Sequence, residues 1–134
     1  NFPLAKQVVD ALNNPDIELM GVYNVSNELI PFYLNAADAL LLTSKWEGSV
    51  NVVKEGLACN LPIVSTDVGD VKLNISGVDG CYVCKQDVND LTEKLNLALS
   101  FGQRTNGRQR IIELGLDSDT IAVKLIEVYN SLLK

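Results

Sequence analysis

Apolar and polar positions follow two different periods along the chain, and together these periods predict a succession of helices and short strands. Apolar residues recur at helical spacing from Leu4 to Leu12, and the polar cluster Asn13-Asn14-Pro15-Asp16 ends that helix. The positions of Leu29, Ile30, Tyr33 and Ala37 predict a second helix over about 29–37, and Pro31 is tolerated there only because it lies near the first turn. The same spacing predicts further helices over about 49–59, 88–101, 108–114 and 118–133.

Four short apolar runs have the length of strands, and their positions predict the fold class. The run 38–43 is almost entirely apolar, as expected for a strand that is buried on both faces. Strands that alternate with helices predict an α/β fold, with a mainly parallel sheet and helices on both faces. With 134 residues we expect a single domain, 1–134. The predicted strands are 17–22, 38–43, 62–66 and 81–84.

Ligands of such sheets bind beyond the carboxyl ends of the strands, which here points to residues 43–51 and 66–70. Gly48 in the first of these loops would let a ligand approach the backbone closely. The next residues, Ser49, Val50 and Asn51, fall at the predicted start of a helix. Because helix N-termini offer free N–H groups and a partial positive charge, these amides could hold a phosphate.

Two carboxylates, Glu47 and Glu55, flank this turn eight residues apart. If the whole interval were helical they would lie ~12 Å apart on adjoining parts of one face, too far for the ~5–9.5 Å of a glycosidase pair. They could instead contact different portions of one extended ligand. Glu55 suits a ribose diol, because a carboxylate accepts from two hydroxyls at once. Spacing alone still favours the alternative, that both are solvated surface glutamates.

Charge and composition exclude several classes of function. The formal net charge of −6 argues against nucleic acid as a partner, because phosphate backbones are bound by clusters of basic residues. The chain has no histidine, which removes Ser-His-Asp and Cys-His nucleophiles and the commonest zinc sites. A zinc site of the commonest type is therefore not expected.

The three cysteines are an odd number, which suits a reducing cytoplasm better than a disulfide framework. Cys81 and Cys84 lie three residues apart on a predicted strand, so their side chains should point to opposite faces. They could not then share a metal, and buried free thiols are expected. The chain shows no secretory leader and no apolar run of the ~18 residues that span a bilayer, so a cytoplasmic protein is expected.

The segment from Glu47 to Gly69 resembles the E-x7-E signature of the large family of retaining, group 1 glycosyltransferases with the GT-B fold. Glu47 and Glu55 have the signature spacing, and Ala58-Cys-Asn-Leu-Pro-Ile-Val-Ser-Thr-Asp-Val-Gly69 matches the strand that follows. The resemblance extends upstream through 33–44 and downstream to Asp79-Gly80-Cys-Tyr-Val83, and covers roughly 17–99.

The resemblance implies a Rossmann-like domain, the C-terminal, donor-binding half of a two-domain enzyme. Such an enzyme transfers a sugar from a nucleoside diphosphate with retention of configuration, and the resemblance implies that it needs no metal and no cofactor. The absent N-terminal domain would bind the acceptor, a surface polysaccharide or a glycolipid, and would carry any peripheral contact with a membrane. Residue by residue, Glu55 would hold the ribose hydroxyls and Glu47 would orient the transferred sugar. The backbone of Gly48, Ser49, Val50 and Asn51 would lie near the sugar and pyrophosphate, and the base would be seated by the loop Val22, Tyr23, Asn24 and Val25.

The chain departs from the family pattern in several places. It begins after the first strand of the implied domain, where the family carries an Arg and a Lys that neutralise the pyrophosphate, so we expect this fragment to be inactive alone. Gly69-Asp70 stands where Gly-Gly is usual, and Leu73 stands where a Glu is expected. Three lysines could compensate in part, although each is expected on a solvated face: Lys45, Lys54 and Lys72. The C-terminal helix is expected to pack partly against the absent half.

Two other classes of function stay open at this point. One is a different nucleotide-sugar enzyme of the same architecture, such as an epimerase or a phosphorylase-like transferase; an epimerase should show a catalytic His or acid. The other is a non-enzymatic α/β binding or regulatory domain, such as a receiver-type switch. That domain would need an acidic cluster at the strand ends, which Asp67 and Asp70 imitate poorly.

Overall fold

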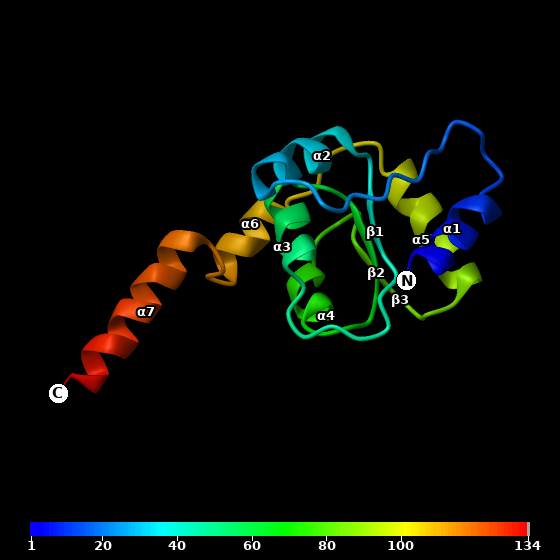
Figure 1. Ribbon diagram of the computed structural model, residues 1–134. Coiled ribbons are helices and arrows are strands. Elements are labelled where there is room, and N and C mark those ends of the chain that lie inside the picture. Colours follow the sequence, from blue (N-terminus) through cyan, green and yellow to red (C-terminus); the bar gives the residue numbers. More distant parts are fainter. Residues whose placement is uncertain (134) are drawn as a thin grey trace.

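A three-stranded parallel sheet, sandwiched between helices, forms the centre of the computed structural model, which describes residues 1–133 (Figure 1). The strands are β1 (Leu40–Leu42), β2 (Ile63–Thr66) and β3 (Tyr82–Cys84), in the order β1-β2-β3. Leu41 lies opposite Val64, and Ser65 lies opposite Val83. The helices are α1 (Phe2–Ala11), the 3-10 turn η1 (Asn27–Leu29), α2 (Ile30–Ala36), α3 (Asn51–Ala58), α4 (Val71–Ile75), α5 (Val88–Ser100), α6 (Gly107–Glu113) and α7 (Ser118–Leu132).

Each face of the sheet is covered by its own set of helices, because the side chains of the buried central strand β2 alternate between two cores. Ile63 faces a core built from α3, α4 and α6, which includes Leu57, Val71 and Ile111. Val64 faces the other core, which α1 and α5 supply with Val8, Leu91, Leu95 and Ala98. Figure 1 shows α1 and α5 on one side of the strands and α3, α4 and α6 on the other. The predicted α/β fold, with a parallel sheet covered on both faces, is therefore confirmed.

Cys81 and Cys84 lie on opposite faces of the sheet, as predicted. Cys81 packs against the core of α3, α4 and α6, whereas Cys84 is buried in the core of α1 and α5. Burial raises the pKa of the Cys81 thiol to about 11. Burial, with the charge of Asp90 added, raises the pKa of Cys84 to about 12. Both side chains therefore behave as buried, protonated thiols rather than as a joint metal site.

The structure departs from the predicted elements in four places, of which only the strand 17–22 is wrong altogether. Residues 17–22 form no strand; the segment runs over the surface without a strand to pair with, and Glu18 and Met20 are exposed. The helix predicted over about 49–59 is present and begins two residues later, at Asn51, because the preceding residue Val50 has an extended backbone. Strand β1 is shorter than expected and only partly buried. The short helix α4, directly after Asp70, was not predicted at all.

No helix within residues 1–133 is both long and apolar enough to cross a membrane. Over the same residues, His, Cys, Asp and Glu side chains nowhere gather in a group of three that could hold a metal ion.

Candidate functional site

The loops that follow the three strands meet at the carboxyl edge of the sheet and are joined by hydrogen bonds. They comprise residues 43–50 after β1, 67–70 after β2 and 85–87 after β3. The carbonyl of Ser44 accepts from Thr66 Oγ1 at 2.7 Å and from Gln86 Nε2 at 3.4 Å. The amide of Asp67 donates to the carbonyl of Cys84 at 3.2 Å. The edge that the sheet topology favours for ligands is therefore a connected surface.

Gly69 allows the loop after β2 to lie directly against the turn at Glu47 and Gly48. Its φ is +53°, in the left-handed region that favours glycine, and a Cβ there would lie 2.1 Å from the Gly48 carbonyl oxygen. At Gly48 itself an added Cβ would meet nothing within 4 Å. The turn is thus packed tightly on its inner side and open on its outer side, as a close approach of a ligand to the backbone requires.

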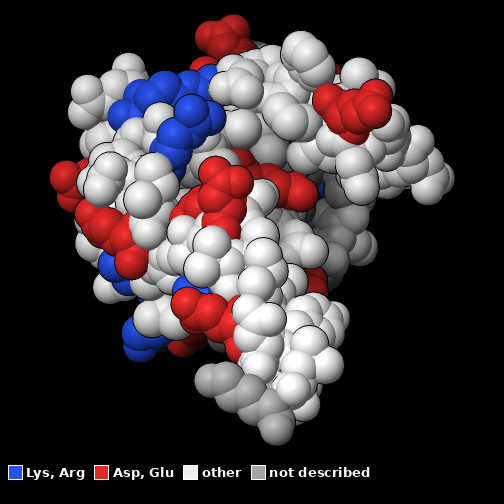
Figure 2. Space-filling view, turned by 90° about the vertical axis from the view of Figure 1, so that its left-hand side faces the viewer, with Lys and Arg blue, Asp and Glu red and all other residues white. Residues whose placement is uncertain are grey.

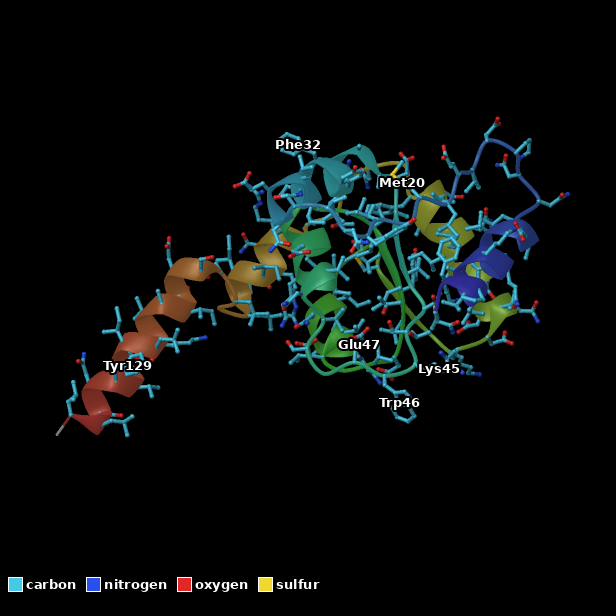
Figure 3. The ribbon with its side chains drawn as sticks, viewed as in Figure 1. Met20, Phe32, Lys45, Trp46, Glu47 and Tyr129 are labelled. Atoms are coloured by element: carbon cyan, nitrogen blue, oxygen red, sulfur yellow. The ribbon has the colours of Figure 1, made fainter. Side chains whose placement is uncertain are left out.

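Glu47 lies on this turn with its side chain exposed, and Ser44 Oγ donates to its Oε1 at 2.7 Å. The hydroxyl fixes the carboxylate close to the end of β1. The neighbouring Trp46 is 89% exposed and points away from the body of the molecule, as Figure 3 shows together with Lys45 and Glu47.

Glu55 lies on the exposed side of α3, whose other side buries Val53, Gly56 and Leu57. Within the described part of the chain its carboxylate makes no hydrogen bond or ion pair with protein, so both oxygens are available to a ligand. The assumption of an uninterrupted helix from Glu47 to Glu55 is wrong, because α3 begins at Asn51. The separation of ~12 Å between Glu47 and Glu55, which assumed such a helix, therefore does not apply.

The amino end of α3 is already occupied by the carboxylate of Asp70. The Val50 amide donates to Oδ1 at 3.0 Å, and Ser49 Oγ donates to Oδ2 at 2.8 Å. The ammonium of Lys54 lies 3.0 Å from Oδ2. Burial opposes the charge on Asp70, but these three groups, together with the Asn74 side chain, outweigh it and hold the pKa of the carboxyl well below its usual range.

Two sequence expectations change as a result. The Val50 amide, which was expected to be able to hold a phosphate, is bonded to Asp70 instead. The side chains of Ser49 and Asn51 are exposed. Lys54, expected on a solvated face, is paired with Asp70 and only 23% exposed. The replacement of Gly-Gly by Gly69-Asp70 was visible in the sequence. The effect of the aspartate, its bonds to Ser49 and Val50, depends on the contact between the two loops and is not readable from the sequence.

The proposed base-binding loop does not lie beside these residues. Val22, Tyr23 and Asn24 are exposed, and Val25 is partly buried. Figure 1 shows this part of the chain passing beside α2, at the other end of the sheet from the loop after β1. Without a strand over 17–22, nothing carries the loop to the carboxyl edge. Its role in binding a base stays a prediction.

Hollows in the surface lie elsewhere. One of about 370 Å³ is lined by residues of α4, of β3 and of the segment that connects them, among them Lys72, Asp79 and Cys81. Another of about 220 Å³ includes Asp38 and Arg104. Neither includes Glu47 or Glu55, which both lie on the exposed surface of the domain.

Comparison with known proteins identifies the family. The family model described as glycosyl transferases group 1 matches residues 3–100. An uncharacterized glycosyltransferase of Methanocaldococcus jannaschii is 33% identical over 84 residues, which are 62% of this chain and 23% of that protein. Sucrose-phosphate synthase from Thermosynechococcus elongatus superposes with a TM-score of 0.74 at 23% identity, over 98% of this chain and 34% of that chain.

The structural likeness shows the fold, that of one half of a GT-B enzyme. This chain spans about a quarter of the length of the archaeal relative and about a third of the synthase. The family model covers most of the chain and includes the whole segment from Glu47 to Asp70. The chain therefore belongs to the group 1 glycosyltransferases.

Proposed function

We propose that this chain is the part of a retaining glycosyltransferase that binds a nucleoside diphosphate sugar, and that a further domain of the full-length protein binds the acceptor. Family membership favours glycosyl transfer over an epimerase or a receiver-type switch. The observation that carries the proposal is the pairing of an open turn with an unpaired carboxylate. The turn is Glu47-Gly48 at the strand ends, and the carboxylate is Glu55 on the helix that follows.

In this proposal each of the two glutamates has a separate role. Glu55 accepts hydrogen bonds from both ribose hydroxyls, because its two oxygens have no protein partner in the described structure. Glu47, held by Ser44 at the end of β1, orients the transferred sugar. The diphosphate lies over the backbone of Gly48–Asn51, where the start of α3 favours negative charge.

The remaining parts of the proposal concern the full-length protein. The acceptor is a glycan or a glycolipid, and any contact with a membrane belongs to the other domain. The base is seated by 22–25, provided that this loop reaches the carboxyl edge in the complete enzyme. Neither a metal nor a cofactor takes part, and the protein works in the cytoplasm.

The test compares the two glutamates by calorimetry with UDP, GDP and ADP. Glu55→Ala should weaken the binding of the preferred nucleotide by about 2–4 kcal/mol, since two charge-assisted hydrogen bonds are lost. This corresponds to roughly 30- to 1000-fold in affinity. Glu47→Ala should leave nucleotide affinity within about threefold of the original and lower kcat of the full-length enzyme instead.

Glu113→Ala is the matched control, because it removes an exposed glutamate of α6 on a different part of the surface. Equal losses of nucleotide affinity in the Glu47 and Glu55 variants would contradict the division of roles. If none of the three nucleotides binds to the full-length protein, the donor proposal itself is wrong.

A further inference from the structure

Asp70 is surrounded by groups that bind anions in general. Its carboxylate accepts hydrogen bonds from the Val50 amide and the Ser49 hydroxyl and forms an ion pair with the Lys54 ammonium, all at the amino end of α3. Lys54 also donates to Ser49 Oγ, so the three donors form one connected group. Amide, hydroxyl and ammonium donors at a helix N-terminus are the groups that hold phosphates in proteins.

A fourth donor at this place is left without a partner. The side-chain amide of Asn74 on α4 is 1% exposed, and its Nδ2 makes no hydrogen bond within the described residues. It lies towards Asp70 and helps to hold the pKa of that carboxyl low. A buried donor without an acceptor is unfavourable, so the Asn74 amide is available to an anion larger than a carboxylate. These four donors, from Ser49, Val50, Lys54 and Asn74, are called the anion seat below.

The anion seat adjoins the turn at Gly48, over which the proposed function places the diphosphate of the donor. A phosphate and the Asp70 carboxylate cannot share it. Two negative groups at hydrogen-bond distance repel strongly where the charges are partly desolvated, and one ammonium neutralises only one of them. The Asp70 and Lys54 side chains are 26% and 23% exposed, so solvent screens this repulsion only in part.

We propose that Asp70 is an internal competitor for the donor phosphate, which occupies the anion seat of the free protein and is displaced when the nucleotide binds. This inference rests on the proposed donor site. When Asp70 is displaced, the Val50 amide, the Ser49 hydroxyl and the Lys54 ammonium bind the phosphate. The Asn74 amide then donates to the phosphate as well. The affinity of the resting protein for a diphosphate is lowered by the fraction of molecules in which Asp70 fills the anion seat.

The first experiment follows backbone amides by NMR while inorganic pyrophosphate is added to the chain. In Asp70→Asn the Val50 and Asn51 amide signals should shift at about tenfold lower pyrophosphate concentration than in the original protein. Asp70→Gly, which restores the Gly-Gly of the family pattern, should behave in the same way. It keeps the test valid if the asparagine variant folds poorly. Asp67→Asn is the matched control, since it removes the same charge from the same loop but no bond to α3.

The second experiment adds Lys54→Met to Asp70→Asn. If the freed ammonium serves the phosphate, the combined variant should lose most of the gain in pyrophosphate affinity. Unchanged or weaker pyrophosphate binding in both Asp70 variants would overturn the inference, and so would an equal gain in Asp67→Asn. Failure of pyrophosphate to bind any variant would overturn it as well.

A third titration, with UDP, GDP and ADP, separates this inference from the proposed function. A gain for pyrophosphate without binding of any nucleotide, in the chain or in the full-length protein, would leave the competitor role standing and refute the donor site. Nucleotide binding that depends on Glu55 but falls in the Asp70 variants would support the donor site. It would show that Asp70 instead holds the turn in its binding conformation.

Discussion

At the scale of single residues, Gly69 and Gly48 lie at the contact between two loops and differ in whether they could carry a side chain. Gly69 adopts a positive φ, and its Cα lies so close to the Gly48 carbonyl that a methyl group cannot fit. Gly48 has open space on the side where a Cβ would be. The first glycine is therefore needed by the fold, and the second is needed only if a ligand comes close.

This difference predicts opposite results for two alanine variants. Gly69→Ala should lower the free energy of unfolding by about 2–4 kcal/mol, because it adds backbone strain and a clash with a carbonyl oxygen. Gly48→Ala should change it by less than about 1 kcal/mol but weaken nucleotide binding in the full-length enzyme. Urea unfolding and calorimetry measure the two effects. If Gly48→Ala binds nucleotide normally, the ligand does not approach the backbone there.

For the residues of the candidate site, the sequence predicted what depends on spacing along the chain and missed what depends on contacts between distant segments. Position around a strand end drew attention to Glu47, Gly48 and Glu55, and the resemblance to the family signature suggested their roles, which stay predictions. The role of Asp70 could not be predicted, because it depends on a contact between residues that are 20 apart in the chain. The same holds for Lys54, whose partner lies on the other loop.

At the scale of elements, hydrophobic periodicity predicted β1, β2, β3 and the helices α1, α3 and α5 to within a few residues. The helices pack one apolar face against the sheet, and the strands are apolar runs within it. The periodicity of each of these segments therefore agrees with its environment in the fold. The run 17–22 has the composition of a strand but no neighbouring strand to pair with, and pairing cannot be read from one segment. Helix α4 is five residues long, too short to show a period.

The bond from Asp70 joins the start of α3 to the start of α4, and its contribution to stability should depend on pH. The pKa of Asp70 is lowered in the folded protein, so the carboxylate stabilises the fold above the ordinary carboxyl pKa. This contribution is lost as the pH falls below about 4, towards the folded pKa. Asp70→Asn should therefore be about 1–2 kcal/mol less stable than the original protein at pH 7.

The difference between the two proteins should narrow steadily when urea unfolding is repeated between pH 5 and the lowest pH at which both stay folded (about 3). Asp67→Asn provides the comparison, because Asp67 makes no bond to α3. A constant difference across this range would mean that the ion pair at the start of α3 contributes nothing to stability.

At the scale of the whole molecule, α7 stands apart from the rest. None of its residues is buried, and Figure 1 shows it projecting away from the sheet and its covering helices. Seen from that side in Figure 2, the projection is mostly uncharged. More than half of the surface of many of its apolar side chains is exposed, including Leu125, Ile126, Val128, Tyr129 and Leu132. Such an apolar surface is expected to be covered by a partner.

In the proposed two-domain enzyme, α7 is covered by the other domain, and this makes a prediction about the isolated chain. A helix of 15 residues without tertiary contacts is only marginally stable in water. Its amide hydrogens should therefore exchange rapidly in the isolated chain, while those of α5 stay protected. Deleting residues 117–134 should change the free energy of unfolding by less than about 1 kcal/mol, because Leu116, the last residue packed on the core, is kept.

In the full-length protein the same helix should be protected from exchange, and replacing Ile126 and Tyr129 by serine should destabilise it by about 2–4 kcal/mol. The two replacements should cost little in the isolated chain, which serves as the control for helix propensity. Sedimentation velocity then distinguishes the occupants of this surface. If α7 is protected in the isolated chain only where the chain is dimeric, a second copy covers it. If exchange of α7 stays rapid in the full-length protein, the other domain does not cover it.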